Sequence, residues 1–340
     1  MKKTGKIIVL AFPDTFVTHS NEWICKFLPL VGLGTKEYIK AGHAALVLVE
    51  NETAKLQYFD FGRYATPDGF GRVRGAVTDA ELEVPFPASF TTDGSLSNLN
   101  EILVWLDAHP NKTHGEGRLL ASVCDFIDFD KAQNFIQNLH ERGSVPYGAF
   151  EKGGSNCARF VTDTIITATS EQKIIKALNF NKKFTPSTVG NVEKAALSND
   201  VYQVVAGNVQ LFKGTAFKEN LRNYFSRKKV DELILELNHA SVIPATAQKL
   251  SGIGSNAWFE LTSEDRLPLH HLRVRRYNDL GKIDFDGVFV SEIFDTNQSF
   301  QFTYDSHCDF CHVYQASKKI KLTKVATFAS FSLSRKMHSA

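Results

Sequence analysis

The sequence has few of the features that mark a membrane, nucleic-acid-binding or disulfide-bonded protein. No segment approaches the roughly 18 consecutive apolar residues that a spanning helix needs. The 39 basic and 37 acidic side chains give a formal net charge of only +2 and are spread along the chain. A basic stripe of the kind that binds nucleic acid is therefore missing.

Cysteine and secretory signals are also scarce. Five cysteines, an odd number in 340 residues, favour free thiols and a reducing compartment. The apolar run 7–12 follows two lysines, but Pro13 and Asp14 end it after about six residues, short of the usual signal length. We therefore expect a buried strand there and a cytoplasmic protein.

The chain is long enough for two domains, with 43% hydrophobic residues available for their cores. The polar stretch 198–200 is the preferred boundary. This predicts an α+β N-terminal domain over residues 1–197 and a smaller, strand-rich domain over residues 198–340. In the first domain, β-branched and leucine-rich runs over 6–12, 44–50 and 56–61 predict strands, the last two joined as an antiparallel hairpin.

The clearest chemical signal is Cys157. A glycine-rich loop over 148–155 precedes it, and Phe160, Val161 and Ile165 continue from it at helical spacing. A cysteine in the first turn of a helix lies close to free backbone N–H groups and to the positive end of the helix dipole. Both favour the thiolate form, which is the nucleophile. The sequence therefore points to Cys157 as a catalytic thiol, although a lone cysteine there is more often a small buried hydrophobe.

A thiol nucleophile needs a base, and His43 opens the strand 44–50 directly after Gly42. A catalytic imidazole is usually oriented by a third polar group. The neighbouring hairpin strand offers Asp60 first, with Tyr58 and Gln57 as alternatives, and Tyr58 and Asp60 share one face by strand periodicity. The strand register cannot be read from the sequence.

These motifs resemble a known family. A Gly-His strand, a hairpin strand of the form aromatic-Asp-Phe-Gly, and much later an Asn-Cys-x-x-Phe-Val helix start are similar to the circularly permuted branch of NlpC-type papain-like cysteine hydrolases, which includes lecithin-retinol acyltransferase-like enzymes. The resemblance covers residues 6–195, including 185–187, which look like a later helix start. Members commonly carry a second histidine or a similar residue about a dozen positions after the first, whereas position 55 here is Lys55.

The resemblance implies a papain-like fold, in which an antiparallel sheet packs on the helix that carries Cys157. It also implies that Cys157 is the nucleophile and His43 the base, with a third polar residue near Asp60, and that the substrate is an amide or ester. No cofactor is implied. The rival hypothesis is a non-catalytic binding module that retains the cleft, with the C-terminal domain recruiting a protein partner. That C-terminal half is similar to a domain of uncharacterised Bacteroidetes proteins.

The pair Cys308 and Cys311 is a second signal, because two thiolates at this spacing can share one zinc ion. A closed site needs two more ligands, and no second Cys-x-x-Cys exists in the sequence. His307, His312, His270 and His271 are the available histidines nearby. We expect two reduced thiols in a turn and no required metal.

Overall fold

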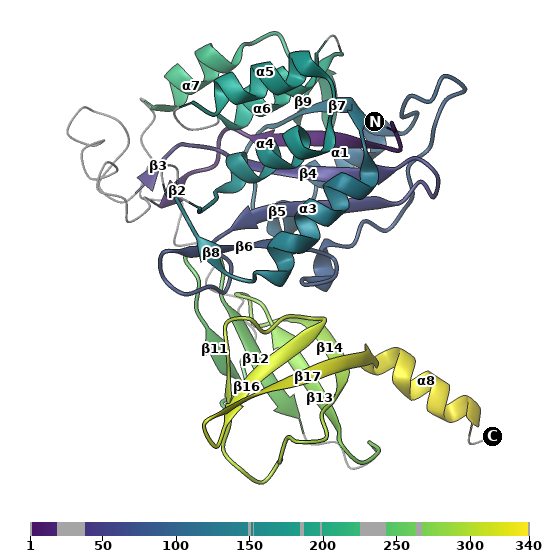
Figure 1. Ribbon diagram of the computed structural model, residues 1–340, viewed down its shortest axis with the longest axis vertical. Coiled ribbons are helices and arrows are strands. Elements are labelled where there is room, and N and C mark those ends of the chain that lie inside the picture. Colours follow the sequence, from purple (N-terminus) through teal and green to yellow (C-terminus); the bar gives the residue numbers. More distant parts are fainter. Residues whose placement is uncertain are drawn as a thin grey trace. The chain divides into compact units, whose positions relative to one another are not determined.

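The computed structural model describes residues 2–18, 38–148, 151, 153–183, 187–197, 199–224, 243–262 and 267–338 (Figure 1). The chain divides into two compact units. The first contains residues 1–62, 71–75 and 82–229, and the second contains residues 63–70, 76–81 and 230–340.

This division corrects the boundary expected at residue 198. β9 (Val201–Val205) pairs with β7 (Leu119–Ile127), and β10 (Asn208–Leu211) pairs with β9, so both strands belong to the first sheet. The stretch that resembled a linker contains a short connection, in which Asn199 Nδ2 donates to the Val123 carbonyl at 3.0 Å. Polar turn residues between a helix and a strand look the same in sequence as a domain linker. Residues 63–70 and 76–81, assigned to the first domain from the sequence, belong to the second unit.

The first unit is built on an eight-stranded sheet with the order β10-β9-β7-β1-β4-β5-β6-β8. β1 lies between β4 and β7, pairs antiparallel with both, and is buried along its whole length. Because both of its faces are covered, its sequence is continuously apolar from Ile7 to Phe12 rather than alternating. The remaining strands of this sheet that position the site are β4 (His43–Glu50), β5 (Leu56–Gly62), β6 (Phe70–Gly75) and β8 (Val145–Pro146), and β1 itself spans Gly5–Phe12.

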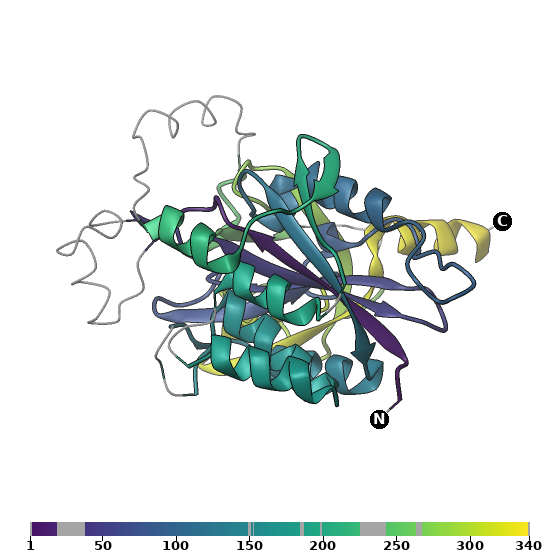
Figure 2. The ribbon, with the colours of Figure 1, turned by 90° about the horizontal axis from the view of Figure 1, so that it is seen from above.

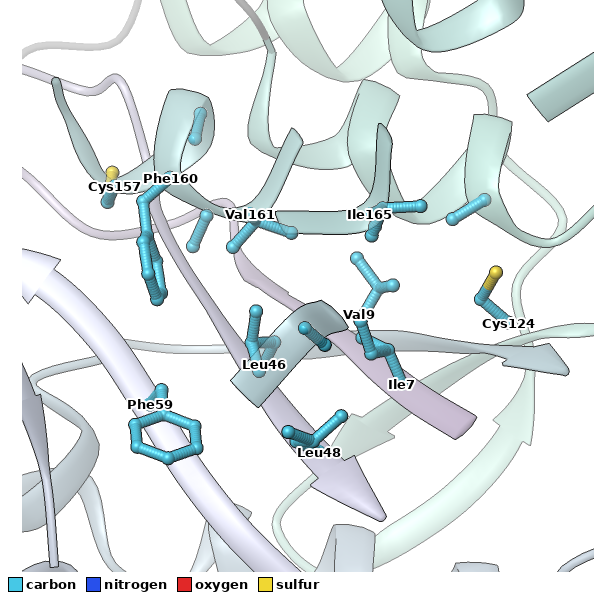
Figure 3. Close-up of a cluster of buried hydrophobic side chains, with 14 of the residues drawn as sticks. Ile7, Val9, Leu46, Leu48, Phe59, Cys124, Cys157, Phe160, Val161 and Ile165 are labelled. Carbon is cyan, nitrogen blue, oxygen red and sulfur yellow. The ribbon is translucent and has the colours of Figure 1, made fainter. Parts of the chain in front are cut away.

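Helices cover the two faces of this sheet (Figure 2). On one face, Phe160, Val161 and Ile165 of α4 pack against Ile7, Val9, Leu46 and Leu48 (Figure 3). On the other face, Ile102, Leu103 and Leu106 of α1 pack against Ile8, Leu10 and Val47. Burial of each such side chain contributes about 1.5–3 kcal/mol. The helices of the first unit are α1 (Leu99–Asp107), α2 (Pro110–Thr113), α3 (Phe129–Glu141), α4 (Cys157–Ala168), α5 (Gln172–Asn181), α6 (Thr188–Ala195) and α7 (Ala216–Tyr224).

The fold class expected from the sequence is confirmed. The helix of Cys157 packs against an antiparallel sheet that contains the strands of His43 and Asp60. Asp128 caps α3, and Ser187 caps α6 by accepting from Gly190 N at 3.0 Å. α7 is described as far as Tyr224, and Cys25, Thr185 and Pro186 lie outside the described residues. β2 (Val17–Thr18) and β3 (Tyr38–Ile39) form a small separate sheet.

The second unit is strand-rich and close to a barrel, with the antiparallel order β11-β12-β13-β14-β17-β16-β15. Its aromatic core includes Phe259, Phe285, Phe289 and Phe302. Cys308 and Cys311 are buried in the same core as free thiols. Its elements are η3 (Ala80–Leu82, which ends in the first unit), β11 (Gln248–Leu250), β12 (Ala257–Thr262), β13 (His271–Tyr277), β14 (Ile283–Val290), β15 (Gln301–Phe302), β16 (Phe310–Gln315), β17 (Lys318–Thr327) and α8 (Phe328–His338).

In the part of the chain that the structure describes, no helix combines the length and apolar character needed to span a membrane.

Candidate active site

Cys157 is the first residue of α4. Asn156 is the N-cap, with extended backbone, and its Oδ1 accepts from Arg159 N at 2.9 Å. Because Cys157 is the first helical residue, its backbone N–H has no hydrogen-bond acceptor within the helix. The glycine-rich sequence before it thus ends in a true helix N-terminus, where partial positive charge favours an anionic sulfur.

His43 is the first residue of β4, and the backbone before it is tightly constrained. Gly42 has φ +75°, and a Cβ at this position would lie 2.8 Å from Thr188 Oγ1. Only glycine fits both the left-handed conformation and this close approach. Phe12, the cross-strand partner of His43, stacks on the imidazole with 6.2 Å between ring centroids. Both constraints hold the ring in one orientation.

Asp60 of β5 lies diagonally across the hairpin from His43. The register pairs Asp60 with Ala45, which is two residues after His43 and therefore on the same face. Asp60 Oδ2 lies 3.5 Å from His43 Nε2. The contact has no hydrogen-bonding alignment, so His43 Nε2 is a buried polar atom without a hydrogen-bond partner among the described residues.

A buried cage fixes the carboxylate of Asp60, which is fully inaccessible to solvent. Arg74 of β6 donates from Nε to Oδ1 at 3.0 Å and from Nη2 to Oδ2 at 2.6 Å. The Tyr58 hydroxyl lies 3.0 Å from Oδ2. Burial alone would raise the pKa of Asp60, but the charge of Arg74 and contacts with His43 hold it well below its usual range. Asp60 is therefore ionised throughout the physiological range.

Two groups converge on the His43 ring and change its acidity. Burial favours neutral imidazole, yet the interactions with Asp60 and with the Cys157 sulfur outweigh it and raise the pKa of His43 from 6.5 to about 9. Since Nε2 faces Asp60, Nδ1 is the nitrogen left for the sulfur. At neutral pH this raised pKa leaves the imidazole protonated beside the Cys157 sulfur, an arrangement that thiol nucleophiles use.

The structure brings together all three residues selected from the sequence, and their catalytic role stays a prediction. Tyr58, an alternative to Asp60, instead contacts the Asp60 carboxylate. Gln57 pairs with Leu48 and lies on the opposite face of the strand. Sequence reasoning missed Arg74, because it did not identify β6. The alternation of Phe70, Arg72 and Arg74 with Gly71, Val73 and Gly75 was the available signal.

The other described cysteines are buried members of hydrophobic clusters. Burial raises the pKa of Cys124 to about 12 and that of Cys308 to about 12, and it raises that of Cys311 well above its usual range. Among the described residues, no group of three or more His, Cys, Asp or Glu side chains is placed to hold a metal ion. That zinc is not required stays a prediction.

Two family models match parts of the chain. Residues 7–174, which include His43, Asp60 and Cys157, match a family described as type VI secretion system effector TseH-like. Residues 247–325 match a family described as the DUF6695 C-terminal domain. Comparison with curated proteins finds no match.

Among solved structures, the chain is similar to the crystal structure of the type VI secretion system effector TseH. The two sequences are 18% identical, the alignment covers 62% of this chain and 98% of that one, and the TM-score is 0.41.

Proposed function

We propose that the first unit is a papain-like cysteine hydrolase or acyltransferase that forms an acyl-enzyme on Cys157. The observation that carries this proposal is the convergence of Cys157 and Asp60 on one buried imidazole, whose pKa they raise to about 9. A structural cysteine has no need of a protonated histidine and a buried carboxylate arranged in series.

The arrangement supports a two-step reaction. The anionic sulfur of Cys157 attacks the carbonyl carbon of an amide or ester, while backbone N–H groups at the start of α4 are available to the developing oxyanion. His43 then gives its proton to the leaving nitrogen or oxygen, and a thioester remains. Water or another acceptor, deprotonated by His43, attacks the thioester and releases Cys157. Asp60 stays ionised and orients the ring throughout.

The family match adds a context for this chemistry. Residues 7–174 are similar to effectors of a secretion system, so we propose that the substrate lies outside the cell that makes the protein. A peptide-like amide, such as those in peptidoglycan-derived peptides, is the proposed substrate class. The permuted NlpC-type branch remains part of this proposal, as does the identity of Asp60 as the third residue.

The second candidate function is a non-catalytic binding module with the same cleft. One observation favours it: only 8% of Cys157 and 6% of His43 are exposed. A hydrolase must admit a carbonyl to the sulfur, whereas a binding module need not.

Trapping of the covalent intermediate separates the two functions. The full chain is mixed with peptidoglycan-derived peptides and with an activated ester, and intact mass is recorded within seconds. We expect an acyl adduct on Cys157 that turns over, that is absent in Cys157→Ala, and that is at least about 100-fold slower in His43→Gln. Cys124→Ala is the control and should match the parent protein. Adduct formation equal in the parent and His43→Gln proteins would favour the binding module.

A further inference from the structure

Arg74 is the nearest charged group to Asp60 that has no assigned part in the proposed reaction. It lies directly opposite Asp60 in the β5–β6 register. We propose that Arg74 is a positioning residue, whose guanidinium fixes the Asp60 carboxylate and moderates its action on His43. This inference rests on the proposed function of Cys157 and His43.

The contact has the geometry of a charge-assisted fork. Nε and Nη2 of Arg74 donate to the two different oxygens of Asp60, at 3.0 Å and 2.6 Å. Only 2% of Arg74 is exposed, and none of Asp60. Two parallel hydrogen bonds from a planar guanidinium fix the orientation of a carboxylate as well as its charge, which lysine cannot do.

The Arg74–Asp60 pair also contacts a helix of the first unit, α2. Nη2 of Arg74 also donates to the carbonyl oxygen of Lys112 at 3.1 Å. The hydroxyl of Tyr58, which donates to Asp60 Oδ2, also lies 3.4 Å from the carbonyl oxygen of Thr113. Both carbonyls belong to α2. Arg74 and Tyr58 therefore lie between the end of this helix and the carboxylate, and rotation of the carboxylate would break its hydrogen bonds to both side chains.

The arrangement places three groups around a single oxygen, Asp60 Oδ2. Arg74 and Tyr58 lie at 2.6 Å and 3.0 Å from it, and His43 Nε2 lies at 3.5 Å without a hydrogen bond. The guanidinium thus binds the oxygen that a closer Asp60–His43 pair would use. It also neutralises part of the negative charge of that carboxylate. This explains why the imidazole, although buried, is left with an unpaired nitrogen.

The direction in which the pKa of His43 should change follows from the groups that act on its ring. They are Asp60 from β5 and Cys157 from α4, with Phe12 of β1 stacked on the ring. Tyr58 of β5 and Arg74 of β6 act through Asp60. A positive charge near an imidazolium lowers its pKa, and a negative charge raises it. Removing the charge of Arg74 should therefore raise the pKa of His43, whereas removing that of Asp60 should lower it.

Titration of His43 by NMR, with histidine ring carbons labelled and His43→Gln used for assignment, tests this in the full chain without a substrate. In Arg74→Gln we expect the His43 pKa to rise by about 0.5–1 unit, and in Asp60→Asn to fall by at least about 1 unit. Arg74→Lys keeps the charge without the fork, so the pKa should stay near that of the parent while alkylation of Cys157 slows about 10-fold.

Arg273→Gln is the matched control. Arg273 makes the same fork with Asp286, from Nε to Oδ1 at 2.9 Å and from Nη2 to Oδ2 at 2.7 Å, but it belongs to the second unit. Its loss should leave the His43 titration unchanged. An unchanged His43 pKa in a folded Arg74→Gln protein, or a fall, would overturn the proposal. If Arg74→Gln does not fold, parent-like alkylation in Arg74→Lys would overturn it instead. Slow alkylation of the parent protein contradicts the proposed function, while the titration still decides the role of Arg74.

Discussion

Asn191 of α6 donates from Nδ2 to the carbonyl oxygen of Ala158 at 2.7 Å, on the residue that follows Cys157. Asn191 is fully buried, and its Oδ1 accepts from Thr162 at 2.8 Å and from Asn181 at 2.9 Å. One amide therefore fixes the first turn of α4 against two neighbouring helices.

Replacing this amide should cost stability and alter the site. Asn191→Ala leaves buried partners unsatisfied, so we expect the free energy of unfolding to fall by about 3 kcal/mol and alkylation of Cys157 to slow. Urea unfolding gives the first quantity. Asn208→Ala, at the exposed first residue of β10, is the control and should change stability by less than about 0.5 kcal/mol. A loss as small as that of the control would mean that the network does not hold α4.

The N-cap of α4 should affect stability and reactivity separately. Asn156→Ala removes the acceptor for Arg159 N and should cost about 1 kcal/mol. Asp128→Ala removes the equivalent acceptor for Lys131 N at the start of α3 and should cost a similar amount. Only Asn156→Ala should slow the alkylation of Cys157. Equal effects on alkylation in the two variants would show that reactivity follows stability alone.

The raised pKa of His43 predicts a pH-dependent stability. A group whose pKa is about 9 when folded and 6.5 otherwise stabilises the protein fully below pH 6.5, and this contribution is lost as the pH rises towards 9. The difference in unfolding free energy between the parent protein and His43→Gln should therefore shrink between pH 6.5 and 9. A difference that stays constant over this range would contradict a protonated His43.

Metal removal should leave the second unit folded. Cys308 and Cys311 are buried, and burial raises the pKa of Cys308 to about 12, which disfavours the thiolate that zinc binds. Melting temperature should be unchanged after chelation, and elemental analysis should find less than stoichiometric zinc. Stoichiometric zinc together with a large loss of stability on chelation would show a structural metal site.

Much of the first unit could be predicted from local patterns. The apolar run that forms most of β1 and the helix that begins at Cys157 are both evident from consecutive residues. β9 and β10 were placed in the wrong unit because strand pairing with β7 is a long-range contact that no local pattern reports. The segments 63–70 and 76–81 were misassigned for the same reason, since residues 82–229 separate them in sequence from the rest of the second unit.

The site residues show the same contrast between local sequence signals and long-range strand pairing. Cys157 and His43 carry local signals, a helix start and a glycine before a strand. Asp60 could be ranked but not assigned, because its position opposite Ala45 depends on strand register. Arg74 could not be identified without β6, and the fork with Asp60 exists only through the pairing of β5 with β6.

The most direct test of the central claim is the rate at which Cys157 of the full chain is alkylated by iodoacetamide, followed by peptide mass spectrometry. The account predicts labelling of Cys157 at pH 7 at least about 10-fold faster than that of an unperturbed thiol, and a fall to the ordinary rate in His43→Gln. Cys124, Cys308 and Cys311 in the same sample serve as internal references for buried thiols. Labelling of Cys157 at the same rate in the parent and His43→Gln proteins would contradict the account.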